Sequence, residues 1–154
     1  MTKYVRYADI KTHNKFSKMV DVAMTINIDL GMSSNGRINL TALALDSSGS
    51  IISIGKNNYC KSHTHQGRIA GKASLMNNSP DLAEKIFIHA EVDAITRAFG
   101  KIRHGTKNNS NRDQLVHALI VVRTLRNGDL ADALPCHICR LAIYNAGISK
   151  VIHT

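Results

Sequence analysis

The spacing of one histidine, one glutamate and two cysteines constrains this chain more than any other feature. The segment His89-Ala90-Glu91 is followed downstream by Pro135-Cys136-His137-Ile138-Cys139. A structural zinc site closes with four protein ligands, whereas a catalytic one keeps three and leaves the fourth position to water. Three soft ligands with a carboxylate beside them therefore predict a zinc centre of the catalytic type.

Two helices are expected to carry these residues. The cysteines, three apart, would share one face of the first turn of a helix over 137–145, where the helix N-terminus favours thiolate. His89 would come from the start of a second helix over 90–99. Because Glu91 lies two residues further on, it does not share the face of His89 in a regular helix. We expect it to reach the water on the metal instead.

Other roles are known for cysteines and histidines in such patterns. A lone Cys-x-x-Cys pair also occurs in redox proteins, but there it follows a strand and needs no upstream His-x-Glu. A histidine in an apolar stretch such as 86–89 is usually a packed core residue. Glu91 and the downstream Pro-Cys-x-x-Cys favour a metal site over both. His137, next to Cys136, would point elsewhere, so we interpret it as a surface or pocket-lip residue.

The pattern His-x-Glu…Pro-Cys-x-x-Cys resembles that of the zinc-dependent cytidine and deoxycytidylate deaminase superfamily. Gly55-Lys56-Asn57 is similar, more weakly, to the Gly-x-Asn at the end of the family's second strand. The resemblance covers about residue 11 to the end. It implies that His89, Cys136 and Cys139 bind one zinc and that Glu91 is the catalytic proton shuttle. It also implies substrate contacts from Asn57, Ala90, Leu134 and Pro135.

Hydrolytic deamination explains why these residue types are needed. Zinc lowers the pKa of bound water from about 16 towards roughly 7 and so supplies a nucleophile at neutral pH. Glu91 would accept the proton of that water and pass it to the ring nitrogen and then to leaving ammonia, as a general base and acid in turn. The carbon attacked bears the exocyclic amine, C4 of a cytosine or C6 of an adenine, and the motif does not choose between them.

Length and composition predict one deaminase domain over 1–154, with a basic segment inserted at about 57–88. A chain of 154 residues, 44% of them hydrophobic, can bury a sizeable core. No run of about 18 apolar residues could span a membrane, and the first residues do not resemble a signal peptide. Because two of the three cysteines are needed as thiolates, we expect a reducing, cytoplasmic environment.

Hydrophobic periodicity predicts an α/β protein, and the resemblance specifies a cytidine-deaminase-like three-layer α-β-α sandwich with a mixed central sheet. Both zinc-binding segments would lie at helix starts beside strand ends, where open α/β sheets place their ligands. The expected elements, in chain order, are a helix over 11–28, a break at 33–36, a hairpin of strands 39–46 and 50–55, a helix over 90–99, a strand over 115–123, a helix over 137–145 and a strand over 149–153.

The insert is basic and longer than an ordinary loop. No acidic residue occurs between positions 47 and 80, and a short helix is expected at 66–75. Long inserts here resemble those of deoxycytidylate deaminases, which implies that Lys61 and Arg68 help to bind the phosphate of a nucleotide. The alternative is a solvated surface. Within the insert, Cys60, His63 and His65, with His104 as a loose fourth candidate, could bind a second, structural zinc, although such histidines more often contact phosphate or solvent.

The substrate stays open between two classes. A second basic stretch, 97–112, includes an asparagine-rich segment at 107–111 expected to be a mobile loop, and the formal net charge of +9 suits anionic ligands. Single-stranded nucleic acid is normally held by stacking as well as by charge, and the chain has only three Phe, four Tyr and no Trp. This favours a free nucleotide, with conversion of dCMP to dUMP as the leading activity.

The sequence is also compatible with two alternative functions. One is a deaminase acting on a base in tRNA or single-stranded nucleic acid, for which the stretch 97–112 could line a groove. The other is a zinc-stabilised binding module without turnover, against which Glu91 argues. No membrane partner is expected, and the resemblance implies a homo-oligomer.

Overall fold

A mixed six-stranded sheet forms the centre of the protein. The computed structural model describes residues 1–10, 15–33, 35–36, 39–105 and 116–154. The strand order is β1-β6-β4-β2-β3, and β5 pairs with β4. β1, β6 and β4 run parallel, while β2 is antiparallel to both of its neighbours. The strands are β1 (Lys3–Arg6), β2 (Leu40–Leu45), β3 (Ile51–Lys56), β4 (Ala118–Thr124), β5 (Leu130–Ala131) and β6 (Lys150–His153).

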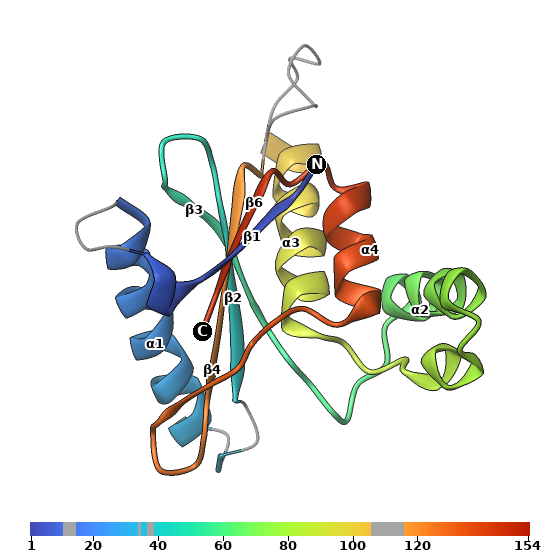
Figure 1. Ribbon diagram of the computed structural model, residues 1–154, viewed down its shortest axis with the longest axis horizontal. Helices are drawn as coiled ribbons and strands as arrows, with labels where there is room; N and C mark the ends of the chain where they lie inside the picture. Colours follow the sequence, from blue (N-terminus) through green and yellow to red (C-terminus); the bar gives the residue numbers. More distant parts are fainter. Residues whose placement is uncertain (11–14, 34, 37–38, 106–115) are drawn as a thin grey trace.

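Helices cover both faces of the sheet, so the three-layer α-β-α order is confirmed (Figure 1). α1 packs on one face, and α3 and α4 pack on the other (Figure 1). The helices are α1 (Lys15–Ser33), α2 (Thr64–Asn77), α3 (Ala90–Gly105) and α4 (His137–Asn145), with short 3-10 helices η1 (Tyr7–Asp9) and η2 (Pro80–Glu84).

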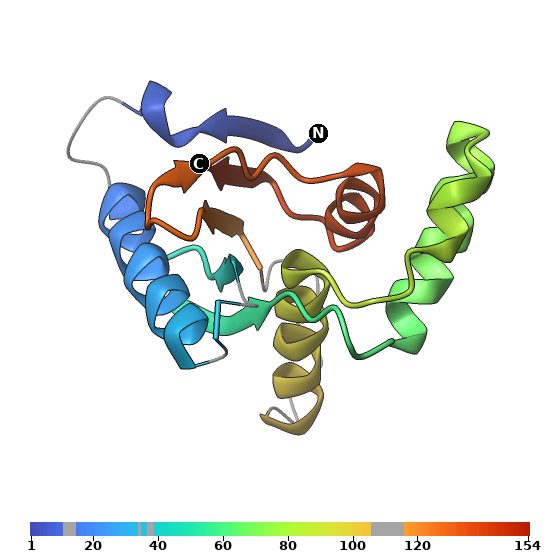
Figure 2. The same cartoon turned by 90° about the horizontal axis from the view of Figure 1, so that it is seen from below.

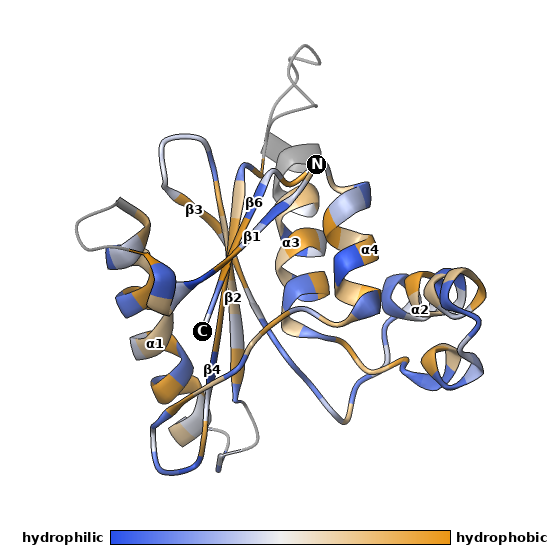
Figure 3. Ribbon diagram, in the orientation of Figure 1, coloured by the Kyte–Doolittle hydropathy of each residue, from blue (hydrophilic) through white to orange (hydrophobic). Residues whose placement is uncertain are grey.

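The sheet separates two apolar cores, because successive side chains along a strand point to opposite faces. In β2, Ala42 and Ala44 belong to the core under α3 and α4, whereas Leu43 and Leu45 belong to the core under α1. Figure 3 shows apolar positions recurring on these helices as well as on the strands. Because both faces are covered, β4 is a nearly continuous apolar run, as predicted for a buried strand.

The insert lies outside the three layers. α2 stands beside α4, away from the sheet (Figures 1 and 2). The two ends of the insert are held together by backbone hydrogen bonds from Asn58 N–H to the carbonyl of Ile88 (3.0 Å) and from His63 N–H to that of Ile86 (3.2 Å). The protruding helix is therefore anchored beside the segment that leads into α3.

Several boundaries differ from the prediction. α1 continues to Ser33, beyond the expected end at 28, and α2 is longer than the expected 66–75. β1 was not predicted. Residues 11–14 and the loop expected at 107–111 lie outside the described residues. None of the helices in the described part of the chain has the length and apolar character needed to cross a bilayer.

Candidate active site

The two cysteines lie at the start of α4. Cys136 is its N-cap residue, and the Cys136 carbonyl accepts the first helical hydrogen bond, from Arg140 N–H at 2.8 Å. Cys139, one turn further on, is fully buried. Both sulfurs therefore lie within the first turn, where the unpaired backbone N–H groups and the helix dipole favour negative charge.

His89 immediately precedes α3, and its imidazole faces both sulfurs. Its Nδ1 lies 3.5 Å from the Cys136 Sγ and 3.3 Å from the Cys139 Sγ. The three donor atoms lie within 4.8 Å of one another. A tetrahedral zinc at about 2.3 Å from sulfur and about 2.0 Å from nitrogen would separate those two donors by about 3.5 Å. These residues fit one zinc ion in donor type and in spacing.

The two cysteines of this donor set differ in ionisation. The Cys139 thiol is hydrogen-bonded to the sulfur of Cys136 and, together with the neighbouring His89, lowers the pKa of Cys136 to about 3. Burial raises the pKa of the Cys139 thiol well above its usual range, and the hydrogen bond to Cys136 raises the pKa of His89. One sulfur is thus a thiolate, the form that zinc binds.

Glu91 lies in the first turn of α3, next to this group. It is 4% exposed, and burial raises the pKa of its carboxyl. Its side chain contacts the Cys139 thiol, yet it is outside the three-residue cluster of potential ligands. A carboxyl group with a raised pKa beside a metal site has the properties of a proton carrier.

Close packing of β3 against α3 brings Asn57 to the His89 segment. A Cβ on Gly55 would lie 2.1 Å from the carbonyl oxygen of Ala90, so only glycine fits there. Asp93, one turn into α3, accepts a hydrogen bond from the backbone N–H of Lys56 (3.1 Å) and binds Arg97 (2.9 Å). Sequence reasoning missed Asp93, although an acid one turn after a ligand was a usable signal.

Asn57 is 5% exposed and held by its own hydrogen bonds. Its Oδ1 accepts from the backbone N–H of Leu40 (3.1 Å), and its Nδ2 donates to the Oδ1 of Asn39 (3.4 Å). Its amide is therefore fixed between the beginning of β2 and the end of β3. Ala90, the neighbour of His89, is fully buried.

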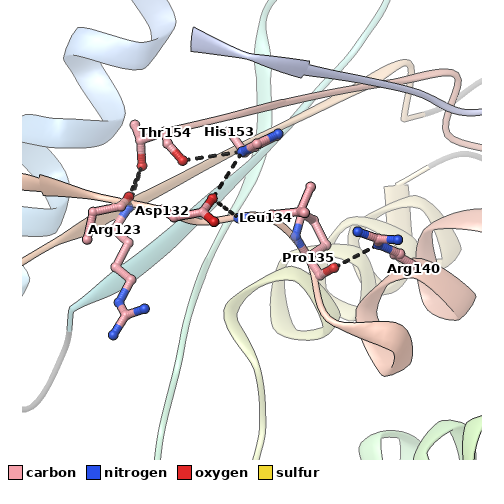
Figure 4. A network of polar contacts seen from close by, with 8 residues as sticks. Arg123, Asp132, Leu134, Pro135, Arg140, His153 and Thr154 are labelled. Carbon is pink, nitrogen blue, oxygen red and sulfur yellow. Dashed lines mark hydrogen bonds and ion pairs between the residues drawn. The ribbon is translucent and has the colours of Figure 1, made fainter. Parts of the chain in front are cut away.

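The segment before Cys136 is also fixed by polar contacts (Figure 4). The buried Pro135 accepts a hydrogen bond at its carbonyl from Arg140 Nε (2.9 Å), and Asp132 accepts one from the backbone N–H of Leu134 (3.0 Å). The Asp132 carboxylate also faces the Nδ1 of the buried His153 at 3.7 Å. Sequence reasoning missed Arg140 and His153. Leu134 is 42% exposed, and His137 is exposed, as its interpretation as a surface or pocket-lip residue requires.

A groove of about 1140 Å³ opens where β2 begins and β3 and β4 end. We call it the strand-end groove. Lys56 and Arg126 bring positive charge to it, and it contains Asn57, but the three potential zinc ligands and Glu91 do not line it. The predicted phosphate contacts Lys61 and Arg68 are exposed and do not line it either. Its lining residues are Asn27, Ile28, Gly31, Met32, Asn35, Gly36, Asn39, Lys56, Asn57, Asn58, Tyr59, Cys60, Thr124, Leu125, Arg126 and Gly128.

The residues considered for a second zinc have other contacts. Cys60 is exposed, and His63 caps α2 by accepting the backbone N–H of His65 at its Nδ1 (3.2 Å). Within the described part of the chain these three do not gather as metal ligands. The side chain of His104 lies outside the described residues, and the second zinc stays a prediction.

Comparison with known proteins agrees with this geometry. Residues 14–154 match the family model described as the cytidine and deoxycytidylate deaminase zinc-binding region. A search of curated proteins finds no match to the chain. The matched residues make up most of the chain and include the potential zinc ligands His89, Cys136 and Cys139. The chain therefore belongs to the cytidine and deoxycytidylate deaminase family and is a zinc-dependent deaminase, a hydrolase.

Proposed function

We propose that this deaminase converts dCMP and water to dUMP and ammonia. The observation that carries the proposal is the charge of the strand-end groove, which shares Asn57 with the predicted site but is not lined by the zinc cluster or by Glu91. It contains Lys56 and Arg126, and among the described residues that line it none is acidic. Such a lining suits a base and sugar with one phosphate dianion, because two cations can share the charge of the phosphate.

The residues of the chain have distinct roles in this proposal. His89, Cys136 and Cys139 would hold zinc, which when bound lowers the pKa of water and supplies a nucleophile near neutral pH. Glu91 would take one proton from the attacking water and deliver it to N3 of the cytosine, and would then carry the second proton, from the new C4 hydroxyl, to the departing amine. The C4–O bond forms first, and the C4–N bond then breaks as the amine receives its proton and leaves as ammonia.

Substrate positioning falls to the segments around Glu91. The NH₂ group of Asn57 carries two donors, one of which faces Asn39, and we assign the other to a sugar hydroxyl or the base. Ala90, Leu134 and Pro135 would contact the base beside the zinc. Lys61 and Arg68 remain candidates for binding the phosphate, but they would reach it only if the ligand extended beyond the groove.

A second candidate is a base in tRNA or single-stranded nucleic acid. The volume of the groove, about 1140 Å³, is larger than the roughly 300–1,000 Å³ of typical small-ligand sites, which favours a longer ligand. The shortage of aromatic side chains argues against a polynucleotide, whose bases normally stack on such side chains: Tyr59 is the one aromatic residue among the described lining residues. We therefore rank the free nucleotide first.

The organisation around this activity is part of the same proposal. We infer one deaminase domain over 1–154, with the insert at 57–88, that assembles as a homo-oligomer in the cytoplasm. Reduced cysteine ligands support the compartment, since zinc requires thiolates. Sedimentation at two protein concentrations tests the assembly.

A panel assay tests the substrate. Ammonia release is measured with CMP, dCMP, cytidine, deoxycytidine, adenosine and guanine compounds, a tRNA and a single-stranded DNA. We expect the highest kcat/KM with dCMP. Turnover of tRNA or single-stranded DNA without turnover of any free nucleotide would reverse the ranking.

A further inference from the structure

Gln66 is a fully buried polar residue in the insert helix. α2 otherwise buries Ile69, Ala70 and Ala73, which are apolar. The Oε1 of Gln66 accepts a hydrogen bond from the backbone N–H of His89 (3.3 Å), and its Nε2 donates to the carbonyl of Lys85 (3.3 Å). One side chain of the insert therefore contacts the backbone at both ends of the segment that leads into the zinc motif.

The N–H of His89 needs a partner from outside its own helix. His89 occupies the N-cap position of α3, where its carbonyl accepts the N–H of Asp93 (2.9 Å). The N–H of an N-cap residue is often bound by a Glu or Gln side chain at the third helical position. In α3 that position is Val92, which has no acceptor in its side chain. Gln66 supplies the oxygen that this position lacks.

We propose that Gln66 is a positioning residue for the zinc ligand His89. The direction of the His89 N–H sets the orientation of the peptide from which its imidazole projects, and the imidazole must meet both sulfurs at 3.5 and 3.3 Å. The insert is tied to the same segment by the hydrogen bonds of Asn58 and His63, so the helix that carries Gln66 stays in place. The insert thus contributes to metal binding in addition to its surface charge.

The test measures metal binding, so it rests on the zinc site and not on the choice of substrate. Gln66→Met keeps the length of the side chain and removes both hydrogen bonds. We expect the zinc dissociation constant, measured by competition with a chromophoric chelator, to rise about 10- to 100-fold, the usual effect of losing a group that orients a ligand. The visible absorption bands of the cobalt(II)-substituted protein should also change, because they respond to ligand geometry.

A matched control separates this effect from general loss of stability. Thr41→Val removes a buried hydrogen bond to Asn27 (2.7 Å) in the core under α1, and should leave zinc affinity and the cobalt spectrum unchanged. If Gln66→Met does not fold, Gln66→Asn, whose shorter amide does not span both partners, is measured in the same way. Wild-type zinc affinity and an unaltered cobalt spectrum in the folded Gln66 variant would overturn the proposal, as would absence of zinc binding by the wild-type protein.

Discussion

Gly55 in β3 lies so close to Ala90 in the first turn of α3 that a Cβ on the glycine would be 2.1 Å from the alanine carbonyl oxygen. The same Cβ would lie 2.3 Å from the backbone N of Ala94. Both neighbours are backbone atoms, which do not move aside as a flexible side chain would. This close contact between β3 and α3 explains why the Gly-x-Asn motif has a glycine, and it places Asn57 beside the zinc-binding segment.

Gly55→Ala should therefore destabilise the fold. Overpacking typically costs 1–3 kcal/mol, and we expect about 3 kcal/mol or more because backbone is displaced. Urea unfolding measures the change. Gly71→Ala in α2 is the control, since its Cβ would meet nothing within 4 Å and alanine stabilises a helix by about 0.5–1 kcal/mol relative to glycine. Equal effects of the two substitutions would contradict the close approach.

Removal of a ligand tests the metal site. Cys139→Ala should lower zinc from one equivalent per chain towards none after dialysis, and should reduce stability, because metal binding is coupled to folding. Cys60→Ala is the control: Cys60 is exposed and outside the cluster of His89 and the two motif cysteines, so one equivalent of zinc should remain. Full zinc content in Cys139→Ala would refute the ligand assignment, and two equivalents in the wild type would support a second site.

Glu91→Gln tests the proton carrier. The substitution keeps the size of the side chain and all three ligands, so zinc content and unfolding should change little while kcat falls by a factor on the order of 10² or more. Glu84→Gln, at an exposed position of η2, is the matched control and should keep wild-type kcat. Full activity of Glu91→Gln would require another mechanism.

The sequence predicted the zinc-binding elements closely because their signals are local. α4 begins and ends where the motif and Gly147 indicate, and α3 begins directly after His89. β1 escaped prediction because four residues of mixed polarity carry no periodic signal. It exists through its parallel pairing with β6, a contact between the two ends of the sequence.

The unpredicted parts of the site depend on contacts between distant segments. Gln66 is polar and lies in a basic insert, so its burial follows only from its bonds to His89 and Lys85. Lys56 and Arg126 both line the strand-end groove because β3 and β4 end on either side of β2. The basic composition of the insert and its resemblance to those of deoxycytidylate deaminases favoured Lys61 and Arg68 for the phosphate instead.

The β2–β3 turn should make stability depend on pH through Asp46. Its carboxylate accepts hydrogen bonds from the side chain and N–H of Ser48 and from the N–H of Ser50, which lower its pKa. A lowered folded-state pKa stabilises the fold above the unfolded-state pKa, near 3.9, and this stabilisation is lost as pH falls through the folded value. Urea unfolding of Asp46→Asn should therefore show a deficit at pH 7 that shrinks below about pH 4. A deficit independent of pH would contradict this role.

Arg126 should distinguish a nucleotide from a nucleoside. It lies in the turn after β4, closed by the hydrogen bond from Gly128 N–H to the Leu125 carbonyl (2.9 Å), and it lines the strand-end groove. Losing one charge-assisted contact costs about 1.5–3 kcal/mol, so Arg126→Ala should raise KM for dCMP roughly 10-fold or more while barely changing KM for deoxycytidine.

The matched variants are Lys61→Ala and Arg68→Ala, which remove exposed charges outside the groove. If the phosphate lies in the groove, these two should leave both KM values near wild type, whereas the expectation from sequence is that they raise KM for the nucleotide alone. A polynucleotide substrate gives a third pattern: several phosphates are neutralised together, so binding weakens steeply with salt, with a log–log slope of several units. That slope for tRNA or single-stranded DNA, with free nucleotides unreacted, would exclude dCMP as the substrate, because one phosphate contributes a slope of about one.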